Sequence, residues 1–184
     1  MRAALLLTLA LMGGALAGTP TGHGGHDMSA PATKEAGTLA ELSSLRGRAF
    51  DVAFAEAMLL HHRMAVEMAR LQVEKGKDAR VKAAARQVIA DQKREMAVME
   101  GWLRAWKLPQ NNMGGTLEVI GLNARQTDRW FLEGMIPHHQ GAIEMAKLVP
   151  ARSQNPQVRQ LAAQIVKTQA AEIEQYRAWL KALP

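Results

Sequence analysis

The feature that most constrains this chain is an internal repeat with a constant offset of 77 residues. The offset aligns Met58 with Met135, His61 with His138 and His62 with His139. Further pairs follow downstream without a gap: Gln87 with Gln164, Gln92 with Gln169, Glu95 with Glu172, Trp102 with Trp179 and Leu103 with Leu180. A repeat of this length without an insertion predicts two copies of one structural unit.

Each copy carries two stretches with helical period. In the first copy, mostly apolar residues recur at steps of four and three. They are Phe54, Met58, His61, Ala65 and Met68 in the first stretch, and Val88, Gln92, Glu95, Met99 and Trp102 in the second. Short breaks at 76–78 and 153–156 make each copy a hairpin, and the Gly- and Asn-containing stretch 108–121 links the copies. We therefore expect an all-α fold: a ferritin-like four-helix bundle made of two repeated helical hairpins, about 45–107 and 122–184, with a long connection.

The N-terminus has the pattern of a cleaved signal peptide over residues 1–17. Arg2 precedes an apolar stretch, Ala3 to Leu16, and Ala15-Leu16-Ala17 is a small-x-small cleavage site. The stretch is shorter than the ~20 residues that span a bilayer. We expect cleavage after Ala17, a periplasmic or secreted protein, and no transmembrane anchor after cleavage.

Residues 18–37 are rich in Gly, Thr, Pro and Ala and are expected to form a flexible leader that contains His23, His26 and Met28. Thr38 and Glu41 match a capping box, which predicts a short helix ending near Gly47. The bundle is expected to occupy 38–184.

The composition limits the kinds of site and partner that this chain can have. The 184 residues include no cysteine, which excludes disulfide scaffolds, iron–sulfur clusters and thiol catalysis. The net charge is +6, but basic and acidic residues alternate along the helical faces, as on a solvated surface. Together with export, this pattern argues against a nucleic-acid partner. The oligomeric state stays open.

A Met-x-x-His-His motif in each copy is the candidate metal site. Adjacent residues on a helix point ~100° apart, so one helix cannot easily aim both histidines at one ion. A shared site therefore needs both copies: Met58 and Met135 with one histidine from each copy. The remaining histidines would form a second site or act as outer groups. The candidate ligands are Met58, His61, His62, Met135, His138 and His139.

Thioether and imidazole ligands favour copper, in particular Cu(I), or the chemically similar silver ion. Zinc prefers thiolate, imidazole or carboxylate ligands.

Met68 and Met145 lie about 10 Å along the axis from the first histidine of each copy, so they are expected to be core, or else part of a second site. Met64, Met96 and Met99 are also expected in the core. The leader residues His23, His26 and Met28 either catch metal loosely and pass it inward or have no metal role.

Four polar residues lie on the apolar stripes of the second helices: Gln92, Glu95, Gln169 and Glu172. A buried carboxylate needs a partner, and a histidine ring N–H is a natural one, so these are candidate outer-shell residues. The alternative is a partly solvated helix edge.

Asp51 and Asp128 are interpreted as first-turn carboxylates favoured by the helix dipole. Pro137 is expected to kink its helix before His138.

The run Met-Ile-Pro-His-His-Gln-Gly-Ala-Ile at 135–143, and the tail from Gln169 through Leu180, resemble the exported bacterial family called domain of unknown function 305. The resemblance covers about Leu39 to Leu183. It implies a ferritin-like fold and, from some members, periplasmic copper binding at Met135, His138 and His139, with the first copy matching at Met58, His61 and His62. The first copy departs from the motif, with Leu59-Leu60 in place of Ile-Pro and Arg63-Met64 in place of Gln-Gly.

The sequence thus favours a non-enzymatic protein that sequesters or delivers Cu(I), with the metal ion and other copper-handling proteins as partners. One alternative is a ferritin-like metal-dependent redox enzyme. Di-iron sites of that architecture use Glu-x-x-His, a motif that these helices do not contain. The other alternative is a metal-free structural or interaction bundle.

Overall fold

The computed structural model describes residues 29–106 and 123–183. It contains α1 (Ser29–Ser44), α2 (Gly47–Lys75), α3 (Ala79–Ala105), α4 (Ala124–Lys147), α5 (Val149–Arg152) and α6 (Pro156–Ala182). The expected signal peptide and the connection at 107–122 lie outside the described residues. Among the described helices, none is both long and apolar enough to cross a membrane.

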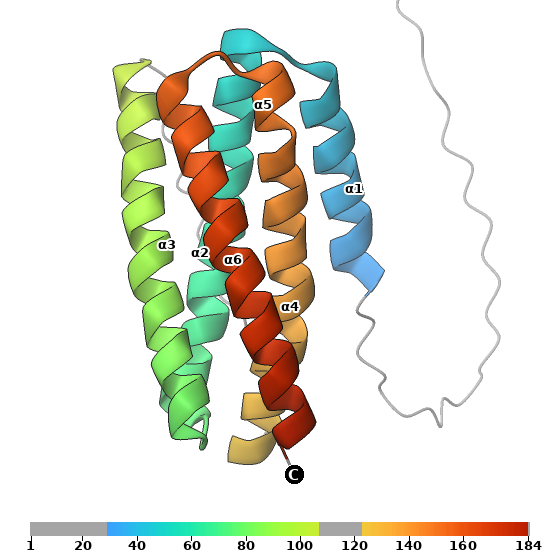
Figure 1. Ribbon diagram of the computed structural model, residues 1–184, viewed down its shortest axis with the longest axis vertical. Helices are drawn as coiled ribbons and strands as arrows, with labels where there is room; N and C mark the ends of the chain where they lie inside the picture. Colours follow the sequence, from blue (N-terminus) through green and yellow to red (C-terminus); the bar gives the residue numbers. More distant parts are fainter. Residues whose placement is uncertain (1–28, 107–122, 184) are drawn as a thin grey trace, which may run out of the picture.

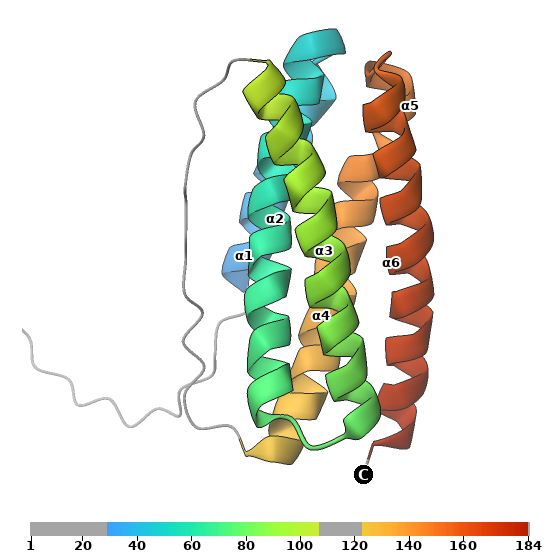
Figure 2. The ribbon, with the colours of Figure 1, turned by 90° about the vertical axis from the view of Figure 1, so that its left-hand side faces the viewer.

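The four long helices form the bundle that the repeat predicts. α2 pairs with α3, α4 pairs with α6, and α2 packs against α4, which joins the two hairpins (Figure 1). α2 and α6 run in one direction, and α3 and α4 run in the other (Figures 1 and 2). Because α3 ends and α4 begins at opposite ends of the bundle, the chain crosses over between the copies, as in ferritin-like folds. The all-helical fold is confirmed.

The core has two buried clusters, one toward each end. The first combines the N-terminal half of α2 with the C-terminal part of α4 and includes Phe54, Met58 and Met145. The second combines the C-terminal half of α2 with the N-terminal part of α4 and includes Met68, Phe131 and Met135. The histidines lie between these clusters along α2 and α4, so polar side chains occupy the middle of the bundle.

Polar caps set the starts of three bundle helices. The Asp78 carboxylate accepts hydrogen bonds from the Arg80 and Val81 amides at the start of α3. Asn155 does the same for α6, and Asn123 forms a capping box with Gln126 at the start of α4. The turns predicted at 76–78 and 153–156 are therefore confirmed, with α6 beginning at Pro156.

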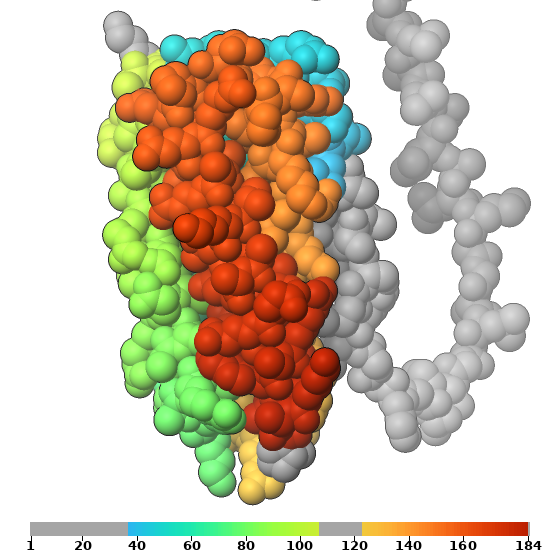
Figure 3. Space-filling model, viewed as in Figure 1, coloured from blue at the N-terminus to red at the C-terminus, as the bar shows by residue number. Residues whose placement is uncertain are grey.

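The first helix begins earlier than predicted. α1 starts at Ser29, so Thr38 is inside the helix rather than at its cap, and the expected 18–37 leader overlaps it. Pro31 falls in the first turn, where proline is tolerated, and strong helix formers follow it. α1 packs against α2 and α4 (Figure 1). A space-filling view shows the C-terminal part of α1, from residue 37, at the edge of the α4–α6 face (Figure 3).

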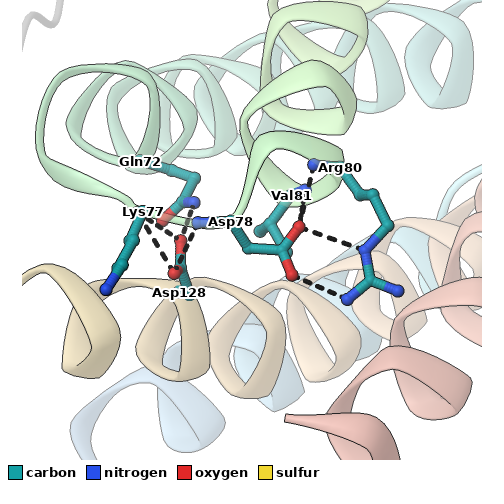
Figure 4. Close-up of polar contacts among 6 residues, drawn as sticks. All are labelled: Gln72, Lys77, Asp78, Arg80, Val81 and Asp128. Atoms are coloured by element: carbon teal, nitrogen blue, oxygen red, sulfur yellow. Dashed lines mark hydrogen bonds and ion pairs between the residues drawn. The ribbon is translucent and has the colours of Figure 1, made fainter.

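Asp128 lies just beyond the first turn of α4, which contains no acidic residue, so the expectation of a first-turn carboxylate is corrected. It is 2% exposed, and its carboxylate accepts hydrogen bonds from the backbone amides of Lys77 and Asp78 and from Gln72 Nε2 (Figure 4). Asp128 therefore ties the turn between α2 and α3 to α4. Its repeat partner Asp51 is also buried.

Two prolines act differently on the second copy. α4 continues through Pro137, which lies inside the helix. The helix ends at Lys147, before Leu148 and three residues before Pro150, and α5 follows. Proline lacks the amide that would bond four residues back, which accounts for the interruption.

Candidate metal centre

One histidine from each copy meets at the centre of the bundle. The rings of His61 on α2 and His138 on α4 have centroids 3.7 Å apart and planes at 43°. Each residue is only 7% exposed. The two repeat copies are related by an internal twofold symmetry, and α2 and α4 are antiparallel. Equivalent residues of the two helices therefore meet at only one level along the bundle, which is the level of His61 and His138. The predicted meeting of one histidine from each copy is therefore present.

Burial favours the neutral form of both rings. Burial, followed by the neighbouring histidines, lowers the pKa of His138 to about 3. Burial and His138 hold the pKa of His61 well below its ordinary value of 6.5. Both ring nitrogens of His138 are buried and lack a hydrogen-bond partner among the described residues. Neutral imidazole nitrogen is the form that binds metal ions.

The second histidine of each pair faces a carboxylate. His62 Nε2 lies 2.6 Å from Glu95 Oε2 on α3, and His139 Nε2 lies 2.9 Å from Glu172 Oε2 on α6. The first contact is an aligned hydrogen bond, whereas the second has ion-pair distance without hydrogen-bond alignment. His62 and His139 are fully buried.

The adjacent histidines are separated as the helical geometry requires. Ring centroids are 6.5 Å apart for His61 and His62 and 6.4 Å apart for His138 and His139. The first histidine of each pair points to the seam between α2 and α4, and the second points to the partner helix of its own hairpin. The remaining candidate outer residues, Gln92 and Gln169, are buried one turn before the glutamates.

The two motif methionines lie on opposite sides of the histidine contact. Met58 and Met135 are fully buried but belong to different core clusters. Each precedes its histidine by three residues, about 4.5 Å along the axis, and the helices run antiparallel. The structure thus brings the imidazoles together and places one thioether toward each end.

The other methionines divide into core and surface. Met68 and Met145 are buried in the clusters, and Met68 Cε lies 2.8 Å from where a Cβ on Gly134 would be. This is tight packing against α4. Met99 is buried as expected, but Met64 is 41% exposed, so the prediction of a core position for Met64 is wrong. His23, His26 and Met28 lie outside the described residues.

Sequence reasoning missed Tyr176, which the offset of 77 aligns with Met99. Its ring centroid lies 5.9 Å from that of His139. Its hydroxyl is buried without a hydrogen-bond partner among the described residues, and burial raises the pKa of the phenol. The two copies therefore differ in the residue one turn after the glutamate. Comparing the aligned copies for substitutions would have revealed it.

The unusual Arg63 of the first copy does not point to the seam. Its guanidinium lies 3.8 Å from Glu100 on α3. In the described residues, no group of three or more His, Cys, Asp or Glu side chains could hold one metal ion.

Comparisons with known proteins agree on one family. The model of the family "Domain of unknown function (DUF305)" matches residues 11–103, 51–129 and 128–183. An uncharacterized protein of Acanthamoeba polyphaga mimivirus is 42% identical over 53 residues, which cover 29% of this chain and only 35% of the viral protein.

Solved structures are similar over the bundle. A DUF305 fragment from Deinococcus radiodurans is 30% identical, with a TM-score of 0.65, and the match covers 72% of this chain and 96% of that chain. A DUF305 protein from Streptomyces coelicolor, described as secreted, is 26% identical with the same TM-score, over 72% of this chain and 93% of that chain. CopM in its Cu(I)-bound form is 32% identical, with a TM-score of 0.65, and the match covers 72% of this chain and 96% of CopM's chain. The chain belongs to the DUF305 family.

Proposed function

We propose that this chain is an exported copper-binding protein that sequesters or delivers Cu(I) through His61 and His138, with Met58 and Met135 as thioether ligands. The observation that carries the proposal is the contact of two buried imidazoles across the α2–α4 seam, 3.7 Å between centroids. The two buried ring nitrogens of His138 have no hydrogen-bond partner among the described residues, which costs free energy, and metal coordination would satisfy one of them.

The chemistry of the surrounding residues suits a soft monovalent ion. Imidazole and thioether are neutral ligands that Cu(I) and Ag(I) accept, and no cysteine competes for the ion. Glu95 and Glu172 contact the outer histidines and would hold those rings in place. Their carboxylates face His62 and His139 rather than the seam. The inner pair, His61 and His138, is therefore the better candidate for a soft ion, and His62 and His139 are the outer pair.

Relatives support the same chemistry. CopM has been solved in Cu(I)-, Cu(II)- and Ag-bound forms at 31–33% identity to this chain. We extend copper or silver binding to this protein as a proposal. Residues 1–17 would direct export and be removed after Ala17, and partner proteins would donate or receive the ion. The proposal assigns no catalytic reaction to the chain.

An anaerobic Cu(I) titration of residues 18–184 against a chromogenic chelator tests the proposal, with Zn(II) as the comparison ion. We expect saturable Cu(I) uptake and weak Zn(II) uptake, with His61→Leu/His138→Leu losing the tight component. The matched variant Met96→Leu, on α3, should retain it. Failure of the native chain to compete for Cu(I) would refute the function. It would leave the metal-free bundle as the better account.

A further inference from the structure

Met64 is exposed where a methionine is unexpected. Among the described residues only Met64 and Val98 are large hydrophobic side chains with high exposure, at 41% and 45%. Isolated exposed apolar residues are common and by themselves indicate nothing. Met64 differs from Val98 in its chemistry, because it carries a thioether, and in its position on α2.

Met64 lies next to the histidine contact. It follows His61 by three residues on the same helix, so the two Cβ atoms are about 5–6 Å apart. Long side chains on a helix lean toward its N-terminus and cover the preceding turn. By this rule the Met64 side chain, which is 41% exposed, leans toward the turn that carries His61.

In the part of the chain that the structure describes, the surroundings leave this position accessible. The repeat partner of Met64 on α4 is Gly141, which has no side chain. α1 packs along α2 and α4 but begins only about halfway along α4 (Figure 1), so it covers the seam toward one end. His61 and His138 each keep 7% exposure, whereas His62 and His139 have none. The inner pair is the one nearer to solvent.

The buried histidine pair beside Met64 also offers ligands that suit a soft ion. Both His138 nitrogens are buried and have no hydrogen-bond partner among the described residues, and the ring lies against that of His61. A soft ion arriving at the surface of α2 would thus meet an exposed thioether first and buried imidazoles one turn away.

Resting on the proposed function, we infer that Met64 is a surface capture ligand that binds Cu(I) first and passes it to the buried His61–His138 pair. A thioether suits this role because it is neutral, soft and weakly held. Arg63 beside it is directed to Glu100, at 3.8 Å, so its charge is partly balanced on the α3 side. Capture affects the rate of loading rather than the final affinity.

The test is anaerobic stopped-flow transfer of Cu(I) from a chromogenic chelator to residues 18–184, with the equilibrium titration run in parallel. Met64→Leu conserves side-chain volume and removes only the sulfur. We expect loading to slow by about threefold or more, with stoichiometry and equilibrium affinity unchanged. Unchanged loading overturns the inference, as does a fall in affinity, which would make Met64 a permanent ligand.

The double variant Met64→Leu/Val98→Met is the matched control, because it moves the exposed thioether from α2 to α3. Loading should stay slow; recovery to the native rate would mean that any surface thioether suffices and would overturn the inference. Gly141→Met adds a thioether at the repeat position and should speed loading. If the native chain takes up no Cu(I), the proposed function fails. If the native chain takes up Cu(I) at the same rate as Met64→Leu, only the capture role of Met64 fails.

Discussion

At the scale of single residues, two histidines adjacent in sequence have different environments. His61 meets His138 across the seam, whereas His62 contacts Glu95 within its own hairpin. The ~100° between successive side chains on a helix causes the division, and it recurs in the second copy. The inner pair is neutral and in contact, and the outer pair is anchored by carboxylates.

Replacing the inner pair separates metal binding from packing. In His61→Leu/His138→Leu, apolar side chains replace buried imidazoles, so the melting temperature of the metal-free protein should stay equal or rise. The stabilisation by Cu(I) should disappear; in the native chain it should reach about 2.7 kcal/mol at a free ion concentration 100 times Kd. Thermal unfolding with and without Cu(I) measures both effects. A retained Cu(I) effect would place the site elsewhere.

His62→Leu provides the contrast. It removes the hydrogen bond at 2.6 Å from the buried Glu95 carboxylate and leaves that group without its partner. We expect a loss of about 1–3 kcal/mol in the free energy of unfolding, measured by urea denaturation. Glu95→Gln in the same background should recover part of the loss, because a neutral amide is cheaper to bury. No recovery would contradict this explanation.

The lowered histidine pKa values predict acid sensitivity. The folded pKa of His138 is about 3, against an ordinary value of 6.5, so below pH 6.5 the unfolded chain binds a proton that the folded chain excludes. Stability is therefore complete above pH 6.5 and falls as pH drops toward 3, by at most about 1.4 kcal/mol per pH unit for this group. Urea unfolding at pH 7, 6 and 5 should follow this trend, and His61→Leu/His138→Leu should flatten it. Equal slopes for both proteins would contradict the assignment.

At the scale of secondary-structure elements, the buried Asp128 carboxylate connects the two hairpins. It accepts hydrogen bonds from the Lys77 and Asp78 amides and from Gln72 on the first hairpin, although it belongs to α4 of the second (Figure 4). The contact fixes where the turn between α2 and α3 rests on α4. It thereby stabilises the register of the α2–α4 seam.

Removing this carboxylate should destabilise the bundle. Asp128→Ala leaves two backbone amides and the Gln72 amide without their acceptor, at a cost of about 2 kcal/mol or more in the free energy of unfolding. Glu133→Ala, on the exposed side of the same helix, breaks only a surface ion pair with Arg129 and should cost less than about 1 kcal/mol. Urea unfolding compares the two variants. Similar small losses would mean that the turn is held by its own caps.

At the scale of the whole molecule, the seam between α2 and α4 is where the two hairpins meet. An ion bound by His61 and His138 would cross-link the hairpins. With a protease site inserted in the 107–122 connection, the cut hairpins should remain associated at lower protein concentration when Cu(I) is present. Size-exclusion chromatography on dilution measures this, with His61→Leu/His138→Leu as the control. Identical dissociation with and without Cu(I) would contradict a shared site.

The sequence by itself determined the fold class and the residues of the candidate site. A gapless repeat with helical period allows few arrangements other than paired hairpins, and the two turns follow from local signals at Gly76–Asp78 and Ser153–Pro156. The helical angle between His61 and His62 also required two copies for one shared contact. These are local or periodic properties, which the order of residues encodes directly.

Only the tertiary structure decided which groups meet and which face solvent. The antiparallel packing of α2 and α4 selected His61 and His138 for the seam and sent Met58 and Met135 to opposite sides of it. It also buried Asp128 under a distant turn and left Met64 exposed. Helical period cannot distinguish these outcomes, because exposure depends on which neighbouring helix covers each face and in which direction it runs.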